Sequence, residues 1–113
     1  MKRYAIRFCH VLLVVPCLCI ATEKRIGEGK KLAFARDKGN CLACHVIAGG
    51  ETPGNIGPPL VAMNQRYADR KALRAKIWDA TETNPKTSMP PFGRHRILTE
   101  EEIDKLVEFV YSL

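Results

Sequence analysis

The sequence predicts an all-α fold in a single small domain. Apolar residues recur at helical spacing, most clearly in the last fifteen residues, and no useful length of chain alternates apolar and polar residues as a strand would. Segments rich in proline and glycine, at 49–59 and 83–93, separate the helical stretches. The chain has 113 residues, which is enough for one domain with a small core.

Residues 1–21 have the three parts of a secretory signal peptide. The first seven residues form a basic region with three lysines or arginines, residues 8–20 form an almost unbroken apolar run, and residues 19–21 have a small-x-small cleavage pattern. The apolar run is shorter than the roughly 20 residues of a membrane span. We therefore expect export to the periplasm, with the signal cleaved and the mature domain formed by residues 22–113.

Cleavage would change the cysteine and charge content of the protein. It would remove three of the 5 cysteines and three of the 18 basic residues, but none of the 12 acidic ones. The mature chain would keep only Cys41 and Cys44, which is too few for a disulfide framework. Its 15 basic and 12 acidic residues would give a net charge of +3, and no basic patch is interleaved with aromatic residues. Nucleic-acid binding is therefore not predicted.

Residues 27–38 predict the first helix of the mature chain, which Gly39 and Asn40 would end. Gly27 and Gly29 lie inside this segment. Because glycine weakens a helix, both positions indicate the close approach of another backbone.

After this helix comes Cys41-Leu42-Ala43-Cys44-His45, which has the C-x-x-C-H pattern of covalent haem attachment. Two thiols one helical turn apart can reach the two vinyl groups of haem and form thioethers. His45 follows Cys41 by four residues, so on a helical turn it shares the same face and can ligate the iron. The sequence predicts one covalent haem c, attached at Cys41 and Cys44, with His45 as an axial ligand of the iron.

Two other interpretations of this motif are less consistent with its surroundings. A thiol-redox C-x-x-C site would follow a hydrophobic strand in a βαβ context, whereas this motif follows a predicted helix. A structural zinc site would need four ligands. Beyond the leader the sequence has one other histidine, His95, and no second cysteine pair.

The proline-rich segment 49–59 is predicted to be a loop. A histidine that ligates haem iron needs an acceptor for its other ring nitrogen, which fixes the tautomer and the ring orientation. The backbone carbonyl of Pro58 is our candidate for this acceptor to His45. The alternative is that the segment serves only as a connection.

Residues 60–67 predict a short helix, and Asp69 can N-cap a longer one that runs through Ala80. Trp78 lies beside the apolar face of this second helix. Its indole N–H can donate to a haem propionate, or the ring can simply pack in the core.

Segment 83–93 is a second proline-rich loop, and Met89 is its one methionine. A thioether on a stiffened loop suits an electron carrier, because methionine ligation raises the reduction potential of haem iron. Met89 is therefore the candidate second axial ligand, and Met63 and His95 are the alternatives.

The C-terminal helix has the clearest signals. Thr99 and Glu102 form a capping-box pattern. The apolar residues that follow have the spacing of one helix face: Ile103, Leu106, Val107, Val110 and Tyr111.

This order of elements resembles that of class I cytochromes c, which are all-α proteins whose first and last helices cross near the haem. The chain is similar in particular to the sulfur-oxidation cytochrome SoxX. Three segments carry that resemblance: residues 39–45, residues 54–60, and residues 89–93 followed by 97–99. It extends over residues 29–113, nearly the whole mature chain.

The resemblance implies the monohaem subunit of a heterodimeric SoxAX complex, an L-cysteine S-thiosulfotransferase. In that family the complex joins thiosulfate oxidatively to a cysteine of the carrier protein SoxYZ. The SoxA partner makes the bond, and the SoxX subunit accepts the electrons and passes them to a downstream acceptor. This chain would then hold no catalytic residue. A free-standing periplasmic electron carrier is the alternative, and a haem enzyme with an open iron position is a third possibility.

Overall fold

The computed structural model describes the backbone of residues 15–113 and the side chains from Leu18 onward. Most of the predicted signal peptide therefore lies outside the described residues. The described part contains four α-helices and two 3₁₀ turns: α1 (Val15–Phe34), η1 (Cys41–Ala43), α2 (Met63–Arg66), α3 (Arg70–Trp78), η2 (Ala80–Glu82) and α4 (Glu100–Tyr111). It contains no strand, so the predicted all-α fold is confirmed.

The first helix is longer at its start and shorter at its end than the sequence predicted. It begins in the apolar leader at Val15 and stops at Phe34, four residues before the predicted end. A tight turn follows, in which Gly39 N donates to Leu32 O at 3.0 Å and Asn40 N donates to Ala35 O at 3.0 Å. This turn satisfies carbonyl groups at the helix end and directs the chain into the C-x-x-C-H motif.

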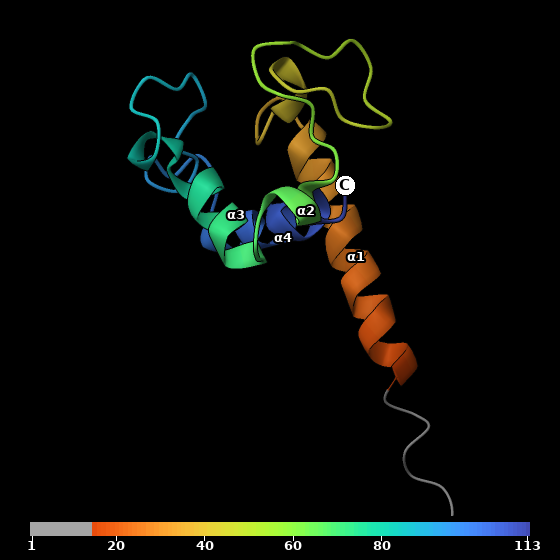
Figure 1. Cartoon of the computed structure of the whole chain (residues 1–113). Coiled ribbons are helices and arrows are strands. Elements are labelled where there is room, and N and C mark those ends of the chain that lie inside the picture. The colour runs from red at the N-terminus through yellow and green to blue at the C-terminus, as the bar shows by residue number, and fades with distance from the viewer. Residues whose placement is uncertain (1–14) are drawn as a thin grey trace, which may run out of the picture.

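Helix α1 crosses α4 at close range (Figure 1). A Cβ atom at Gly29 would lie 2.0 Å from the backbone oxygen of Lys105 and 2.8 Å from Cβ of Phe109. The rings of Phe34 and Phe109 pack edge to face at 6.1 Å between centroids. The predicted close approach is therefore confirmed at Gly29. It was wrong at Gly27, where a Cβ would meet nothing within 4 Å.

Helix α3 packs on α4 and has the predicted N-cap. The Asp69 carboxylate accepts from Ala72 N at 2.8 Å. Two ion pairs join the helices, Arg70 with Glu108 at 3.0 Å and Arg74 with Asp104 at 2.7 Å. Because these arginines are partly exposed, the pairs orient α3 more than they stabilise it.

Helix α2 is only four residues long, so the helix predicted over 60–67 was too long. Ala62 at its N-cap has φ of 50°, a left-handed conformation that interrupts any earlier helix. The backbone N–H of Met63 donates to Leu113 O at 2.9 Å, which fastens α2 to the C-terminus of the chain.

The capping box of α4 is present, because Thr99 and Glu102 each accept a hydrogen bond from the other's backbone N–H. Four of the five predicted core residues of this helix are buried, and Tyr111 is half-buried. Phe109 is also buried and was not predicted. Its burial shows that α4 is covered on two sides, by α1 and by α3, so its apolar face is wider than one stripe.

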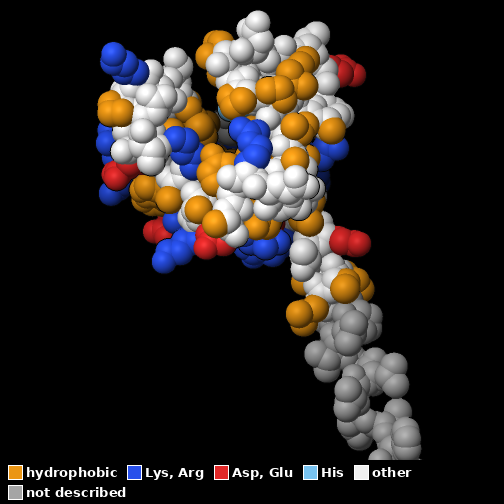
Figure 2. All heavy atoms as spheres, in the orientation of Figure 1, with side chains coloured by type: hydrophobic (Ala, Val, Ile, Leu, Met, Phe, Trp, Pro, Cys, Tyr) orange, Lys and Arg blue, Asp and Glu red, His pale blue; other side chains and the backbone are white. Residues whose placement is uncertain are grey.

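Two loop regions rise from the same side of α4 (Figure 1). One runs from η1 to α2 and the other from η2 to α4. The space-filling view shows the surface hollowed between them (Figure 2). None of the described helices is both long enough and apolar enough to span a membrane.

Candidate haem site

A cavity of about 730 Å³ lies between the two loop regions. Its walls come from the C-x-x-C-H turn, the proline-rich loop, α2, α3, the methionine loop and α4. This volume is within the range of about 300–1,000 Å³ that is usual for ligand and cofactor sites. All five site residues proposed from the sequence line it: Cys41, Cys44, His45, Pro58 and Met89.

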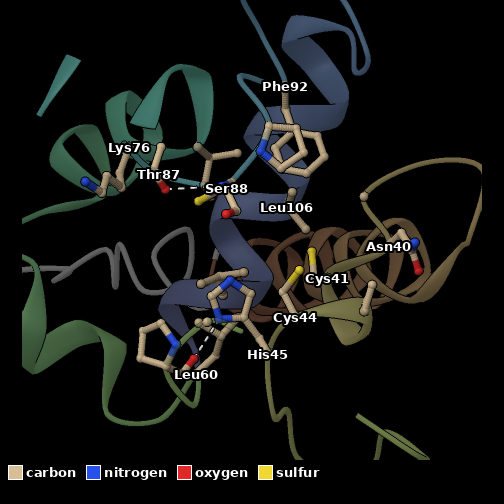
Figure 3. Close-up of a pocket in the computed structure, with 18 of the residues that line it drawn as sticks. Asn40, Cys41, Cys44, His45, Leu60, Lys76, Thr87, Ser88, Phe92 and Leu106 are labelled. Atoms are coloured by element: carbon tan, nitrogen blue, oxygen red, sulfur yellow. Dashed lines mark hydrogen bonds between the residues drawn. The ribbon is translucent and has the colours of Figure 1, made fainter. Parts of the chain in front are cut away.

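The C-x-x-C-H motif forms a tight turn that presents its three functional side chains together (Figure 3). Asn40 enters the turn with φ of 46°, and His45 N donates to Cys41 O at 2.9 Å. That bond spans four residues, as in one helical turn, so Cys41 and His45 share a face. In Figure 3 the sulfur atoms of Cys41 and Cys44 lie side by side at the pocket wall, close to the His45 ring.

The environment of Cys41 does not suit an activated thiolate. Burial raises the pKa of its thiol to about 11, so the thiol of the free polypeptide stays protonated at neutral pH. Redox C-x-x-C sites instead depend on a lowered thiol pKa. The described residues also contain no group of three or more His, Cys, Asp or Glu side chains that could hold a metal ion. The pair fits thioether attachment better than either alternative.

The His45 ring is oriented by the proline-rich loop. Its Nδ1 lies 2.6 Å from the Pro58 carbonyl oxygen, the contact that the sequence analysis had proposed. A carbonyl can only accept, so Nδ1 donates the hydrogen and Nε2 keeps a free lone pair, as an iron ligand requires. A Cβ atom at Gly57 would lie 2.3 Å from Cε1 of the ring. Glycine is therefore required there for the loop to lie flat against the imidazole.

The same loop is held against the motif by its backbone. Gly54 N donates to Leu42 O and Gly57 N donates to Cys44 O, both at 2.8 Å. A Cβ at Gly54 would lie 1.9 Å from Ala43 O. These contacts make the loop part of the wall of the site, so it is more than a connection.

Met89 enters the cavity from the other loop. Thr87 and Ser88, which immediately precede it, lie on the side of the pocket opposite His45 (Figure 3). Met89 N donates to the Thr87 hydroxyl oxygen at 3.1 Å, and Thr87 N donates to Asn84 O at 3.0 Å. The Met89 side chain is half-buried against the core.

The two alternative ligands are less well placed. His95 is exposed and does not line the cavity. Met63 does line it, but its sulfur accepts from Arg66 Nη1 at 3.3 Å. The same nitrogen donates to Pro59 O at 2.8 Å, so Arg66 holds the Met63 thioether at the proline-rich loop.

The cavity also has a basic rim that sequence analysis did not find. Lysines and arginines from four separate segments line it, and no aspartate or glutamate does within the described part of the chain. The rim consists of Arg36, Lys38, Arg66, Lys76 and Lys86. Lys38 is paired with Glu102 at 2.7 Å, and the positive charge of the other four residues suits the two propionates of haem. Trp78 is not part of this lining, and its ring packs against Gly93 instead.

This geometry is that of a class I cytochrome c: an all-α fold, a cavity between two loops, and a C-x-x-C-H turn with its histidine anchored on a proline carbonyl. Residues 26–113 match the family model of cytochrome c, and the chain belongs to that family. Its motif carries one covalently attached haem c, as the sequence predicted.

Two similar proteins indicate which cytochromes c this chain resembles. A crystal structure of SoxXA from P. pantotrophus matches with a TM-score of 0.69 and 28% sequence identity, covering 76% of this chain and 79% of that one. The resemblance to SoxX is thereby confirmed. An uncharacterized lipoprotein of Aquifex aeolicus (strain VF5) is 37% identical over an 80-residue alignment that covers 66% of this chain. This chain spans only 37% of the length of that relative.

Proposed function

We propose that this chain is the electron-accepting subunit of a SoxAX-type complex, which joins thiosulfate oxidatively to a cysteine of a carrier protein. The observation that carries the proposal is a cavity lined both by His45, which is anchored on Pro58, and by Met89 from the other loop. His45 and Met89 would together supply two protein ligands to a haem iron, which would leave no open position for chemistry on a substrate. The structural match to SoxXA supports the choice of complex.

Each residue of the proposed site has one role. Cys41 and Cys44 would hold the haem through thioethers, His45 Nε2 and Met89 Sδ would ligate its iron, and the Pro58 carbonyl orients the His45 ring. The bound haem would supply a one-electron iron couple, whose potential methionine ligation raises. We expect the haem to stay with the polypeptide through extraction with acidified solvent, and replacing both cysteines with alanine to abolish stable holoprotein. Complete release of haem from the wild type would contradict covalent attachment.

Met89→Ala tests the ligand set. We expect it to open the sixth position, lower the reduction potential and let external ligands bind. Met63→Leu is the matched control, because it removes the other thioether that lines the cavity while keeping apolar volume. A spectrum that is unchanged in Met89→Ala but altered in Met63→Leu would reverse the assignment.

In the proposed reaction, bond formation and electron acceptance occur in different subunits. Forming a sulfur–sulfur bond between a carrier thiol and thiosulfate releases two electrons and one proton. After signal cleavage both cysteines of this chain are used by haem, so no thiol remains here to act as nucleophile. We therefore assign bond formation to the SoxA-type partner and electron acceptance, one electron at a time, to this chain.

Exposed apolar side chains at the cavity mouth provide a surface for that partner. Ile56 is 71% exposed and Ile97 is 40% exposed, and both line the cavity. A permanent partner would bury such residues over a larger area than a transient redox encounter does. We expect the mature holoprotein to form a stable heterodimer with a SoxA-type partner, observed by size-exclusion chromatography.

Ile56→Lys should weaken this association. Val61→Lys is the control, because Val61 is also apolar and 56% exposed but does not line the cavity. If the wild type does not associate and instead reduces a terminal oxidase efficiently, the chain is a free-standing electron carrier. If the wild type binds external ligands as fast as Met89→Ala does, a haem enzyme with an open position becomes the better account.

We also propose that residues 1–21 are a cleaved signal and that the mature protein acts in the periplasm. Cleavage at this point would remove the first turns of α1, where Leu18 and Ile20 are 69% and 67% exposed. The exposure of these residues is consistent with a segment that the folded domain does not need. Intact-mass analysis of the exported protein should give a chain that begins at Thr22 with one haem added. A mass that retains the apolar leader would contradict cleavage.

A further inference from the structure

The loop that carries Met89 closes on itself at a narrow neck. Gly93 N and Arg94 N both donate to the carbonyl oxygen of Trp78, at 3.1 and 3.3 Å. A Cβ atom at Gly93 would lie 2.1 Å from the Trp78 ring, so the backbone of Gly93 also lies directly against the Trp78 side chain. The end of α3 and the end of the methionine loop therefore meet directly.

An ion pair lies across this neck. The Asp79 side chain is 2% exposed, and its Oδ2 lies 2.8 Å from Arg94 Nη1. Its other oxygen, Oδ1, accepts from Thr81 N at 3.0 Å and from the Thr81 hydroxyl. The hydrogen bonds from Thr81, with the charge of Arg94, hold the pKa of Asp79 below its ordinary value.

The Asp79 carboxylate is consequently charged, and it depends on Arg94. Within the described residues no hydrogen bond satisfies Oδ2, so the guanidinium is the group that compensates it. A buried carboxylate without a partner is costly, and removing the partner of a buried pair is far more destabilising than the net value of the pair.

The N-terminal part of the loop has few hydrogen bonds to the rest of the fold, although the Met89 side chain packs against the core. Met89 N donates to Thr87 and Thr87 N donates to Asn84, and both bonds stay inside the loop. Asn84 N donates to Ala80 O of η2 at 3.1 Å, and one side-chain contact reaches α3, from Lys76 to Thr83. A segment with so few hydrogen bonds opens easily unless its base is fixed.

We propose that the Asp79–Arg94 pair is a positioning clamp that closes the neck of the methionine loop and sets how firmly the Met89 thioether stays on the iron. Neither residue lines the cavity, so both act through the loop. This inference rests on the ligation by Met89 that is proposed above.

The test of the clamp is the rate at which imidazole replaces the Met89 thioether in the ferric mature holoprotein. This rate is measured by stopped-flow absorption spectroscopy. Imidazole can bind only after the thioether leaves, so the limiting rate reports opening of the loop. Asp79→Asn and Arg94→Gln should each raise this rate roughly tenfold, the change expected from losing one charge-assisted contact. The double variant should be no faster than the faster single variant, because either change already breaks the pair.

Arg70→Gln is the matched control. The Arg70 side chain is 54% exposed and pairs with Glu108 at 3.0 Å, whereas Arg94 is 55% exposed and pairs with Asp79 at 2.8 Å. The control therefore removes an equally exposed arginine from the α3–α4 contact without touching the neck, and its partner Glu108 is 23% exposed where Asp79 is 2% exposed. It should bind imidazole at the wild-type rate.

The outcomes separate the clamp from the ligand assignment. A wild type without a methionine–iron absorption band overturns both. The clamp alone is overturned by a different combination of results. In that case the wild type has the band and Met89→Ala lacks it, but Arg94→Gln binds imidazole at the wild-type rate. An equal acceleration in Arg70→Gln also overturns it, because the effect would then come from general loss of stability. Arg94→Gln is sufficient for this decision if Asp79→Asn does not fold.

Discussion

Replacing Gly29 with alanine would test the crossing of α1 and α4, on which both walls of the site depend. The new Cβ would lie 2.0 Å from Lys105 O, a backbone atom that cannot rotate away. Because an ordinary van der Waals contact needs about 3.5 Å, the helices would have to separate by roughly 1.5 Å. Gly27 lies in the same helix with nothing within 4 Å of its Cβ position, which makes Gly27→Ala a matched control.

The two substitutions should have opposite signs. Alanine gains up to about 1 kcal/mol over glycine in a helix interior. At Gly27 we expect about 0.5 kcal/mol of stabilisation, because the position is close to the mature N-terminus. At Gly29, overpacking against the backbone should cost about 3 kcal/mol, for a net loss near 2 kcal/mol. For a domain of this size that loss lowers the melting temperature by about 8–16 °C.

The assay is thermal unfolding of the two mature holoproteins beside the wild type, followed by circular dichroism. We expect Gly27→Ala to melt slightly above the wild type and Gly29→Ala well below it. Equal melting temperatures for the two variants would refute the close backbone crossing, since helix propensity alone would then explain both.

Three further predictions concern the site and its support. Gly57→Ala should push the His45 ring off the Pro58 carbonyl and raise the high-spin fraction in the visible spectrum, because its Cβ would lie 2.3 Å from Cε1. Thr99→Ala should remove the cap of α4 and cost about 1 kcal/mol in denaturant unfolding. The pKa of Glu102 is lowered, chiefly by its hydrogen bond from Lys38. The charged Glu102 side chain therefore stabilises the fold at pH values above the ordinary glutamate pKa, and this stabilisation is lost as the pH falls through the lowered pKa of the folded protein. Glu102→Gln should therefore be less stable than the wild type near neutral pH, with a gap that narrows on acidification.

Features that depend on nearby residues could be predicted from the sequence. The capping box at Thr99 and the N-cap at Asp69 each use a donor three residues away. The contact between His45 and Pro58 spans one short loop, whose composition indicated its course. In such cases the local chain fixes the geometry before the domain packs.

Features that depend on the arrangement of the helices could not be predicted. The sequence did not distinguish Gly29 from Gly27, because only the direction of the helix face toward α4 separates them. Phe109 was omitted because its burial requires a second neighbour on the side of α1. The ion pair of Asp79 with Arg94 joins residues that approach only when the methionine loop has closed.

The central claim is that this chain receives electrons from thiosulfate oxidation in a partner and does not itself react with thiosulfate. The direct measurement is the anaerobic reduction of its ferric haem, followed by absorption, as components are added in turn. We expect no reduction with thiosulfate alone or with thiosulfate and the carrier. Reduction should begin when the SoxA-type partner is added and should stop when the carrier cysteine is blocked. Rapid reduction by thiosulfate without the partner, or no reduction in the complete mixture, would contradict the account.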